Sequence, residues 1–331
     1  MKKLIIAMII ISICSLPLLA DVFGKSGTAS LQFLKLGIDA RAIGMGEAYT
    51  AVSNDISSVY WNPAGLALKD ENQLFLSHTN WVGETYHEYL AYSTVIGLGY
   101  VALSASVFYT PLMDETTESE FGPTGRTFRF SNSAVGLTYA NAFTDQFSFG
   151  ITGKYLNENI ADQSIHSFAV DFGTQYNTNW RNTIIGMSLR NFGPDVQYNV
   201  EQKDKPIQTG NPLDHVDKSG TAAPIPMNFS LGLATDIFRE DSSYLLASVQ
   251  LDNTVDRSET WNVGAEYNWN ILFLRGGYQI NYDAASYSFG FGVKVPARFA
   301  IINIDYAFTD MGRLQEDFMT AAHRLSLKMA F

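Results

Sequence analysis

Residues 31–66, LQFLKLGIDARAIGMGEAYTAVSNDISSVYWNPAGL, set the N-terminal part of the chain apart from everything that follows. This stretch is rich in Gly and Ala. It shows neither the sustained 3.6-residue period of a long helix nor the alternation of a strand. From about Gln73 to the C-terminus the chain alternates instead. We therefore expect an all-β protein, with a compact hatch (or plug) over residues 21–70 inside a transmembrane antiparallel β-barrel over residues 71–331.

Each alternating segment places large apolar side chains on one face and small or charged ones on the other. Leu103 and Val107, for example, alternate with Ala102, Ser104 and Ser106. A soluble β-sandwich also alternates, but the polar face of such a sheet usually carries Lys, Glu and Thr rather than Gly, Ala and Ser. Charged residues make up 17% of the chain and aromatics 13%, and the aromatics gather near segment ends, as in the girdles of membrane barrels.

The alternation predicts a barrel of about fourteen strands. They lie near residues 73–81, 87–97, 99–110, 127–141, 146–157, 165–177, 183–192, 227–237, 244–252, 260–268, 271–281, 286–295, 299–309 and 322–331. All links after even-numbered strands are short, and the long links (111–126, 193–226 and 310–321) follow odd-numbered strands. An even strand number, short periplasmic turns and long outer loops are typical of bacterial outer-membrane barrels.

The last predicted strand alternates up to the final residue. Leu325, Leu327, Met329 and Phe331 are its apolar positions. A terminal strand of this kind, ending on an aromatic residue, is similar to the C-terminal signal that the outer-membrane barrel-assembly machinery reads. We therefore expect Phe331 to belong to an insertion signal.

Residues 1–20 have the pattern of a cleaved secretory signal peptide. Lys2 and Lys3 form a basic start, an apolar run follows, and Ala20 offers a small residue for cleavage before Asp21. A membrane anchor is disfavoured because the run is shorter than the ~20 residues that a spanning helix needs. Cleavage would also remove the only Cys of the chain, which leaves no disulfide and no thiol chemistry.

The charge and motif content exclude several function classes. The chain has a net charge of −11, which argues against a nucleic-acid partner because such partners attract basic surfaces. Gly44-x-Gly46 lacks the third Gly of a dinucleotide site, so no cofactor is predicted. The five His have no metal-ligand spacing, and Ser77 and His78 lack an acid that would orient a catalytic His. We therefore expect no enzyme activity.

Charged residues also fall on the small-residue phase, which would face the lumen. Their signs alternate between neighbouring strands, as in Glu266 and Arg275, so they should attract across the sheet. We predict a lumen network that stabilises the wall and holds the hatch. Its members are Lys154, Asp171, Arg190, Asp236, Glu266, Arg275, Lys294, Asp305 and Lys328.

The N-terminal region resembles the signature of the PorV/PorQ family, within the superfamily of the long-chain fatty-acid transporter FadL. The resemblance is carried by Phe33-Leu34-Lys35-Leu36-Gly37, Ala40-Arg41-Ala42-x-Gly44-Met45-Gly46-x-Ala48, Asp55 and Asn62-Pro63-Ala64-Gly65-Leu66. It implies a fourteen-strand barrel with a hatch in its lumen. Within this motif we expect the hatch residues to be Arg41, Gly44, Gly46, Asp55, Asn62, Pro63, Ala64 and Gly65.

The resemblance implies an outer-membrane component of type IX secretion that binds or shuttles secreted cargo. Its expected partners are outer-membrane lipid, the barrel-assembly machinery, secretion-system subunits and cargo. A FadL-like channel for long-chain fatty acids or other hydrophobic compounds is the alternative. A channel of that kind needs an apolar path, and the small, charged lumen phase weakly favours secretion.

Overall fold

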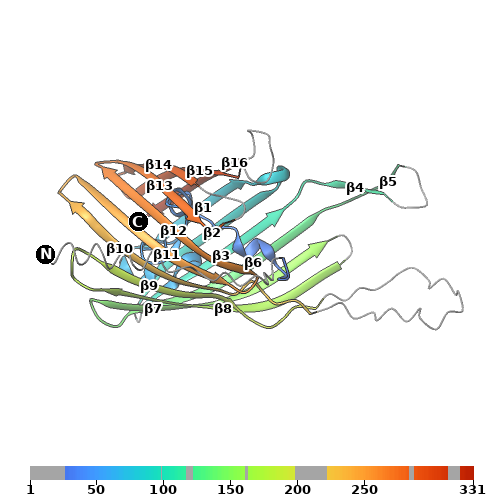
Figure 1. Cartoon of the computed structure of the whole chain (residues 1–331), viewed down its shortest axis with the longest axis horizontal. Helices are drawn as coiled ribbons and strands as arrows, with labels where there is room; N and C mark the ends of the chain where they lie inside the picture. Colours follow the sequence, from blue (N-terminus) through green and yellow to red (C-terminus); the bar gives the residue numbers. More distant parts are fainter. Residues whose placement is uncertain are drawn as a thin grey trace, which may run out of the picture.

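The computed structural model describes residues 27–97, 99–116, 122–160, 163–197, 222–282, 287–311 and 321–331. Fourteen antiparallel strands close into a barrel, in which β1 pairs with both β2 and β16 (Figure 1). The strands are β1 Gln73–Asn80, β2 Tyr86–Ile96, β3 Gly99–Tyr109, β6 Phe130–Ala142, β7 Phe147–Ile160, β8 Gln163–Asn177, β9 Ile184–Phe192, β10 Asn228–Arg239, β11 Ser243–Thr254, β12 Arg257–Trp269, β13 Leu272–Ile280, β14 Tyr287–Pro296, β15 Ile301–Asp310 and β16 Ala321–Ala330. The predicted barrel and its strand number are confirmed.

The long link after β3 differs from the loop predicted at residues 111–126. It contains a two-stranded sheet, β4 (Met113–Thr116) and β5 (Pro123–Phe128), which projects beyond one end of the barrel (Figure 1). β6 consequently begins at Phe130 rather than near residue 127. The prediction missed this hairpin because Asp, Glu and Thr dominate its first half without an apolar face.

The two faces of the barrel wall follow the predicted alternation. Outward-pointing Leu103 and Phe168 are 58% and 65% exposed, whereas the inward-pointing Ala102 and Ala169 are 1% and 2% exposed. Large apolar side chains therefore cover the outside, where a membrane barrel meets lipid. Small side chains leave room inside the barrel.

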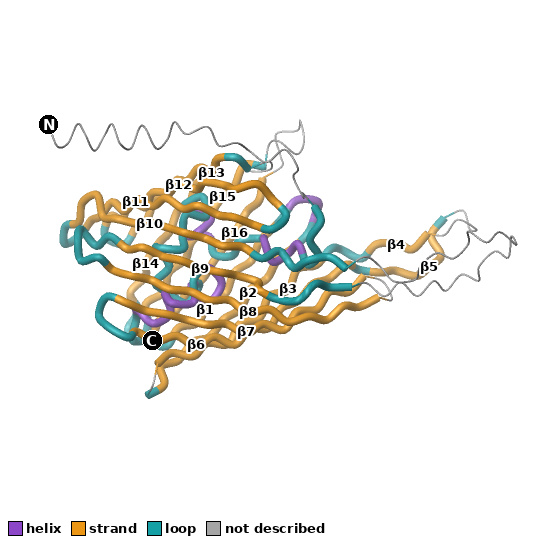
Figure 2. The backbone as a smooth tube through the Cα atoms, turned by 60° about the horizontal axis from the view of Figure 1, so that its bottom comes forward, coloured by secondary structure: helices purple, strands orange, loops and turns teal. Residues whose placement is uncertain are grey.

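Residues 27–69, here called the N-terminal segment, lie inside the barrel as a series of short helical turns (Figure 2). The turns are η1 (Gln32–Lys35), α2 (Ala40–Gly44), α3 (Ser58–Trp61) and η2 (Pro63–Leu68); a further turn, η3 (Val82–Glu84), joins β1 to β2. Polar side chains cap the N-termini of two of these turns, α2 and η2. The Asp39 carboxylate accepts a hydrogen bond from the Arg41 N–H, and the Asn62 side chain accepts one from the Ala64 N–H, each at 3.2 Å.

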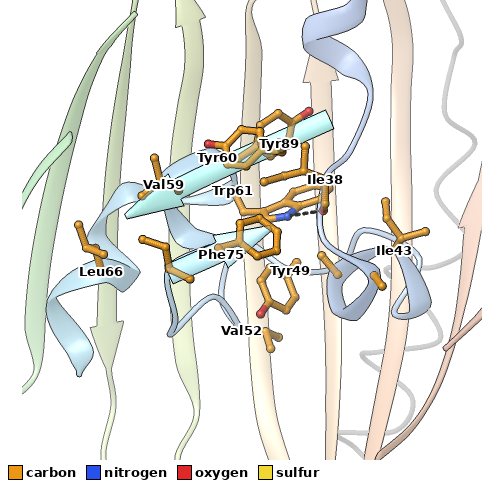
Figure 3. Packing of buried hydrophobic residues seen from close by; sticks show 14 of the residues in the cluster. Ile38, Ile43, Tyr49, Val52, Val59, Tyr60, Trp61, Leu66, Phe75 and Tyr89 are labelled. Atoms are coloured by element: carbon orange, nitrogen blue, oxygen red, sulfur yellow. Dashed lines mark hydrogen bonds between the residues drawn. The ribbon is translucent and has the colours of Figure 1, made fainter. Parts of the chain in front are cut away.

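The apolar core of the protein lies in the lumen and is supplied mainly by the N-terminal segment (Figure 3). Trp61 is its largest fully buried side chain, and its indole N–H donates to the Ile38 carbonyl at 3.1 Å. The Tyr60 ring packs edge-on against Trp61 with centroids 4.9 Å apart. From the wall, Phe75 and Tyr89 complete the cluster.

Glycines on the inward face bring the wall backbone against the N-terminal segment. A Cβ placed on Gly150 of β7 would lie 2.4 Å from the Pro63 carbonyl carbon, and one on Gly277 of β13 would lie 2.1 Å from the Gly46 nitrogen. Both neighbours are backbone atoms, which cannot move aside as a flexible side chain can. The close fit therefore requires glycine at these two positions, because any side chain there would overlap the N-terminal segment.

The helices within the described residues are all too short or too polar to cross a membrane. The predicted signal peptide, residues 1–20, and residues 21–26 of the predicted hatch lie outside the described residues.

We predict that Gly150→Ala lowers the free energy of unfolding by about 1–3 kcal/mol, because the added methyl overpacks a fixed backbone contact. Gly153→Ala on the same strand is the matched control, since a Cβ there meets nothing within 4 Å. Urea unfolding of the refolded barrel, followed by tryptophan fluorescence, measures both variants. Equal stability of the two variants would contradict the close fit.

Candidate functional site

Lys328 on β16 binds two buried carboxylates of the N-terminal segment. Its ammonium lies 2.6 Å from Asp39 Oδ2 and 2.8 Å from Asp55 Oδ2. The hydroxyl of Ser57 donates to the other Asp55 oxygen at 2.5 Å. Burial raises the pKa of the Asp55 carboxyl, but Lys328 and Arg41 outweigh that effect, so its pKa lies well below the ordinary value. Asp55 is therefore ionised.

Arg41 of the N-terminal segment forms a second buried contact with the wall. Its guanidinium donates two parallel hydrogen bonds to Glu266 on β12, from Nε and Nη2, each at 2.8 Å. Arg275 on β13 donates to the same carboxylate at 2.6 Å and to Asp305 on β15 at 2.6 Å. A guanidinium that donates two parallel hydrogen bonds to one carboxylate forms one of the strongest hydrogen-bonded contacts in proteins.

Because residue 292 of β14 is a glycine, Arg275 on β13 can reach Asp305 on β15. Gly292 lies between the two strands, and a Cβ on it would come within 2.1 Å of the Asp305 carboxylate and 2.8 Å of the Arg275 guanidinium. The chain Arg41–Glu266–Arg275–Asp305 thus crosses four wall strands, from β12 to β15. Together with Asp39, Asp55 and Lys328 it forms what we call the lumen charge cluster.

Among the remaining predicted lumen charges, Lys154 and Asp171 form an ion pair across neighbouring strands, whereas Arg190 does not join them. Lys154 on β7 pairs with Asp171 on β8 at 2.5 Å, but Arg190 on β9 forms no ion pair among the described residues. Its guanidinium lies over the Tyr60 ring, 5.0 Å from the centroid. A bulge between β8 and β9, beside Asp171, shifts the register, and Asp171 accepts a hydrogen bond from the backbone N–H of Asn191.

Asp236 and Lys294, two other predicted members of the network, are not part of the lumen charge cluster. Asp236 pairs with Arg239, three residues along its own strand, at 2.6 Å. Within the part of the chain that the structure describes, Lys294 has no carboxylate within 4 Å. It lines a polar cavity of about 240 Å³ at the short-turn end, together with Lys69 and Asn303.

The glycines and the Asn-Pro-Ala-Gly run of the expected hatch motif sit at backbone contacts. Gly44 faces Gly290 of β14, and Gly65 faces the Ser53 carbonyl. The Asn62 amide donates to the carbonyls of Thr50 and of Thr174 on β8. Pro63 and Ala64 pack over Gly150. These residues therefore shape the segment and its fit, whereas Arg41 and Asp55 supply its charges.

Sequence reasoning missed several residues that hold the segment. Asp39 lay within the non-periodic stretch, where no pattern marks a lumen charge. Two long amides also contribute: Gln250 on β11 accepts from the backbone N–H groups of Tyr49 and Thr50, and Gln175 on β8 donates to the Ser53 carbonyl. A Gln on the inward phase of a strand, where it would be buried without a charge of its own, is the signal that would have found the glutamines.

Phe331, the predicted end of the insertion signal, exchanges backbone hydrogen bonds with Asn72 and is 49% exposed. Among the described residues, no group of three or more His, Cys, Asp or Glu side chains is arranged to hold a metal ion.

We predict that Lys328→Met lowers the free energy of unfolding by about 3–5 kcal/mol, because Asp39 and Asp55 lose their shared cation while they remain buried. Lys294→Met should change it by less than about 0.5 kcal/mol, since that Lys has no such pair. Urea unfolding measures both, and limited proteolysis reports release of the segment. A Lys328→Met protein as stable as Lys294→Met would show that the cluster contributes nothing.

Comparisons with solved structures identify the fold. The toluene transporter TodX of Pseudomonas putida is similar, with a TM-score of 0.55 and 12% identity over 87% of this chain and 95% of that one. The toluene transporter TbuX of Ralstonia pickettii and a FadL homologue of Pseudomonas aeruginosa each give 0.54 at 13% identity over 89% of this chain, and cover 97% and 98% of their own. At such identities the likeness shows the fold alone.

The sequence comparisons identify the family. No curated protein matches the chain significantly, but the family model described as "Type IX secretion system protein PorV" matches residues 24–255. Both family and fold are those of transport or secretion barrels rather than of enzymes. The chain therefore belongs to the PorV family, the outer-membrane β-barrel proteins of type IX secretion, as the resemblance of its N-terminal region implied.

Proposed function

We propose that this PorV-family barrel binds secreted cargo at the outer membrane while residues 31–66 remain in the lumen as a fixed hatch. The observation that carries the proposal is the distribution of contacts to the N-terminal segment. They come from Gln175 on β8, Gln250 on β11, Glu266 on β12 and Lys328 on β16. A segment anchored to strands on several sides of the barrel is suited to blocking passage. Such a barrel would serve as a platform for partners.

The cavities do not favour the alternative, a channel for hydrophobic compounds. The apolar cavity between Phe33, Tyr60 and Tyr89 measures about 20 Å³, whereas a cavity that takes up benzene measures about 150 Å³. The 240 Å³ cavity is lined by Arg41, Asp55 and other charged or amide side chains, together with Phe273, Ile301 and Met329. Neither offers an apolar path. The similarity to toluene transporters concerns the fold, which does not by itself determine function.

The β4–β5 hairpin supports protein binding at the long-loop end. It projects past the rim (Figure 1), and Leu112 and Met113 at its base are 63% and 37% exposed. Asp114 and Arg126 add charges of both signs. Exposed apolar side chains bordered by charges are typical of interaction sites. We propose that cargo or secretion-system subunits contact this hairpin, that outer-membrane lipid covers the apolar outer wall, and that the assembly machinery reads the strand ending at Phe331.

Replacing residues 113–128 by a short Gly-Ser linker should abolish cargo capture but leave barrel assembly intact, because the fourteen barrel strands lie outside the hairpin. Pull-down with secreted cargo measures capture, and heat-modifiability on gels measures assembly. Inserting the same linker at Asn270, in a turn at the opposite end, is the control. Cargo capture that survives loss of the hairpin would remove this surface from the proposal.

Deleting residues 31–66 should raise single-channel conductance in planar bilayers from near zero to that of an open barrel, because the deletion removes the material that fills the lumen. Lys294→Met, which leaves the segment and its ion pairs in place, should stay closed. An assembled deletion variant that conducts no better than the wild type would contradict the hatch. A wild-type barrel that conducts toluene would favour the alternative.

A further inference from the structure

A groove of about 410 Å³ lies on the outward face of the wall, where β16, β1, β2 and β3 are neighbours. Leu76, Leu90, Leu325 and Leu327 line it. Its floor includes Ala105, which stands opposite Leu90 and carries only a methyl group between Leu103 and Val107 on β3. The groove is therefore a local depression in an apolar, membrane-facing surface.

One end of this groove is polar. The His78 imidazole lies 2.7 Å from Glu88 Oε1 and 3.1 Å from Asn80 Oδ1. The prediction that no acid lies beside His78 was therefore wrong, although Ser77 points to the other face of the strand, where it is buried against Ser326. The side chains of His78 and Glu88 are 46% and 41% exposed, so both face outward. Two residues closer to the β1–β2 link, Tyr86 stands opposite Tyr109 with ring centroids 5.4 Å apart.

The position of this pair decides its environment. The β1–β2 link follows an odd-numbered strand and so belongs to the outer side of the membrane, where the Tyr86–Tyr109 pair marks the aromatic girdle. Glu88 lies about 7 Å further along the strand, toward the membrane interior. A carboxylate at the edge of the apolar band is costly unless it is hydrogen-bonded. His78 meets only part of its capacity, because a carboxylate has two oxygens with about four acceptor sites.

We propose that the groove binds one acyl chain of an outer-leaflet lipid and that Glu88 accepts a hydrogen bond from a hydroxyl or amide group near the head of that chain. The leucines offer an apolar surface to the acyl chain, and the His78–Glu88 pair lies at the depth in the membrane where an acyl chain joins the lipid head group. A 3-hydroxyacyl chain, as in lipid A, supplies such a donor, whereas an ordinary phospholipid acyl ester does not. Lipid covers this face of a membrane barrel, so the groove is in contact with the proposed ligand. The inference does not depend on the hatch or on cargo binding.

Native mass spectrometry of the detergent-solubilised full barrel tests the site with two probes, lipid A and phosphatidylcholine, whose head group has no N–H or O–H donor. The wild type should retain lipid A roughly tenfold better, the discrimination expected of one hydrogen bond to a charged group. Ala105→Leu fills the groove and should abolish this preference. The matched control is Ala265→Leu, on the outward face of β12, which should behave as the wild type. Glu88→Leu should lower lipid A retention to the phosphatidylcholine level.

Three results would overturn the proposal. The wild type could retain both probes equally, which would leave an adventitious annular lipid only. Ala105→Leu could keep the wild-type preference, which would place the lipid elsewhere. Photo-crosslinking from position 105 in intact cells could yield a protein adduct instead of lipid, which would identify the groove as a protein contact. Heat-modifiability checks that every variant is folded, and Glu88→Leu tests the polar end without filling the groove.

Discussion

The ammonium of Lys328 lies between the carboxylates of Asp39 and Asp55, and this contact joins the last strand of the barrel to the N-terminal segment. The same strand, β16, pairs with β1 and so closes the barrel. Two buried carboxylates without a cation would be strongly destabilising. The arrangement of the segment in the lumen therefore depends on a strand that is synthesised last. Closure of the wall and seating of the segment are coupled through this strand, on which Ser326 and Arg324 also bond to the backbone of the segment.

The fold places its apolar surfaces in two separate locations. Outside, leucines, valines and aromatics meet lipid, which is as apolar as they are. Inside, the wall combines Gly, Ala and Ser with charged, amide and hydroxyl side chains, and the segment brings its own core around Trp61 and Tyr49. A small-residue wall permits backbone contact at Gly150 and Gly277, where close packing replaces side-chain interdigitation. The remaining inner wall supplies the charges and amides that the polar backbone of the segment requires.

The chain shares its fold with toluene transporters but belongs to a secretion family. The interior of the barrel explains how both can hold. The barrel fold is shared with toluene transporters, but function lies in sites placed on a fold. Here the lumen contains a charge cluster that crosses several strands and a cavity lined by polar groups. The apolar space beside Tyr60 is about the size of one water molecule. These features are consistent with a barrel that acts through its surfaces.

The sequence by itself determined the barrel, its strand number and which face of each strand points outward, because a period of two is a local property of the chain. It also indicated the family, through the Gly- and Asn-Pro-Ala-Gly-containing stretch before β1. It missed the β4–β5 hairpin, whose Asp, Glu and Thr residues carry no apolar face. Only the tertiary structure decided which charges meet. A bulge beside Asp171 leaves Arg190 over an aromatic ring, and Gly292 lets Arg275 reach past its neighbouring strand. Asp39 joins Lys328 across 289 residues of sequence, and such a contact follows from closure of the barrel, not from any local pattern.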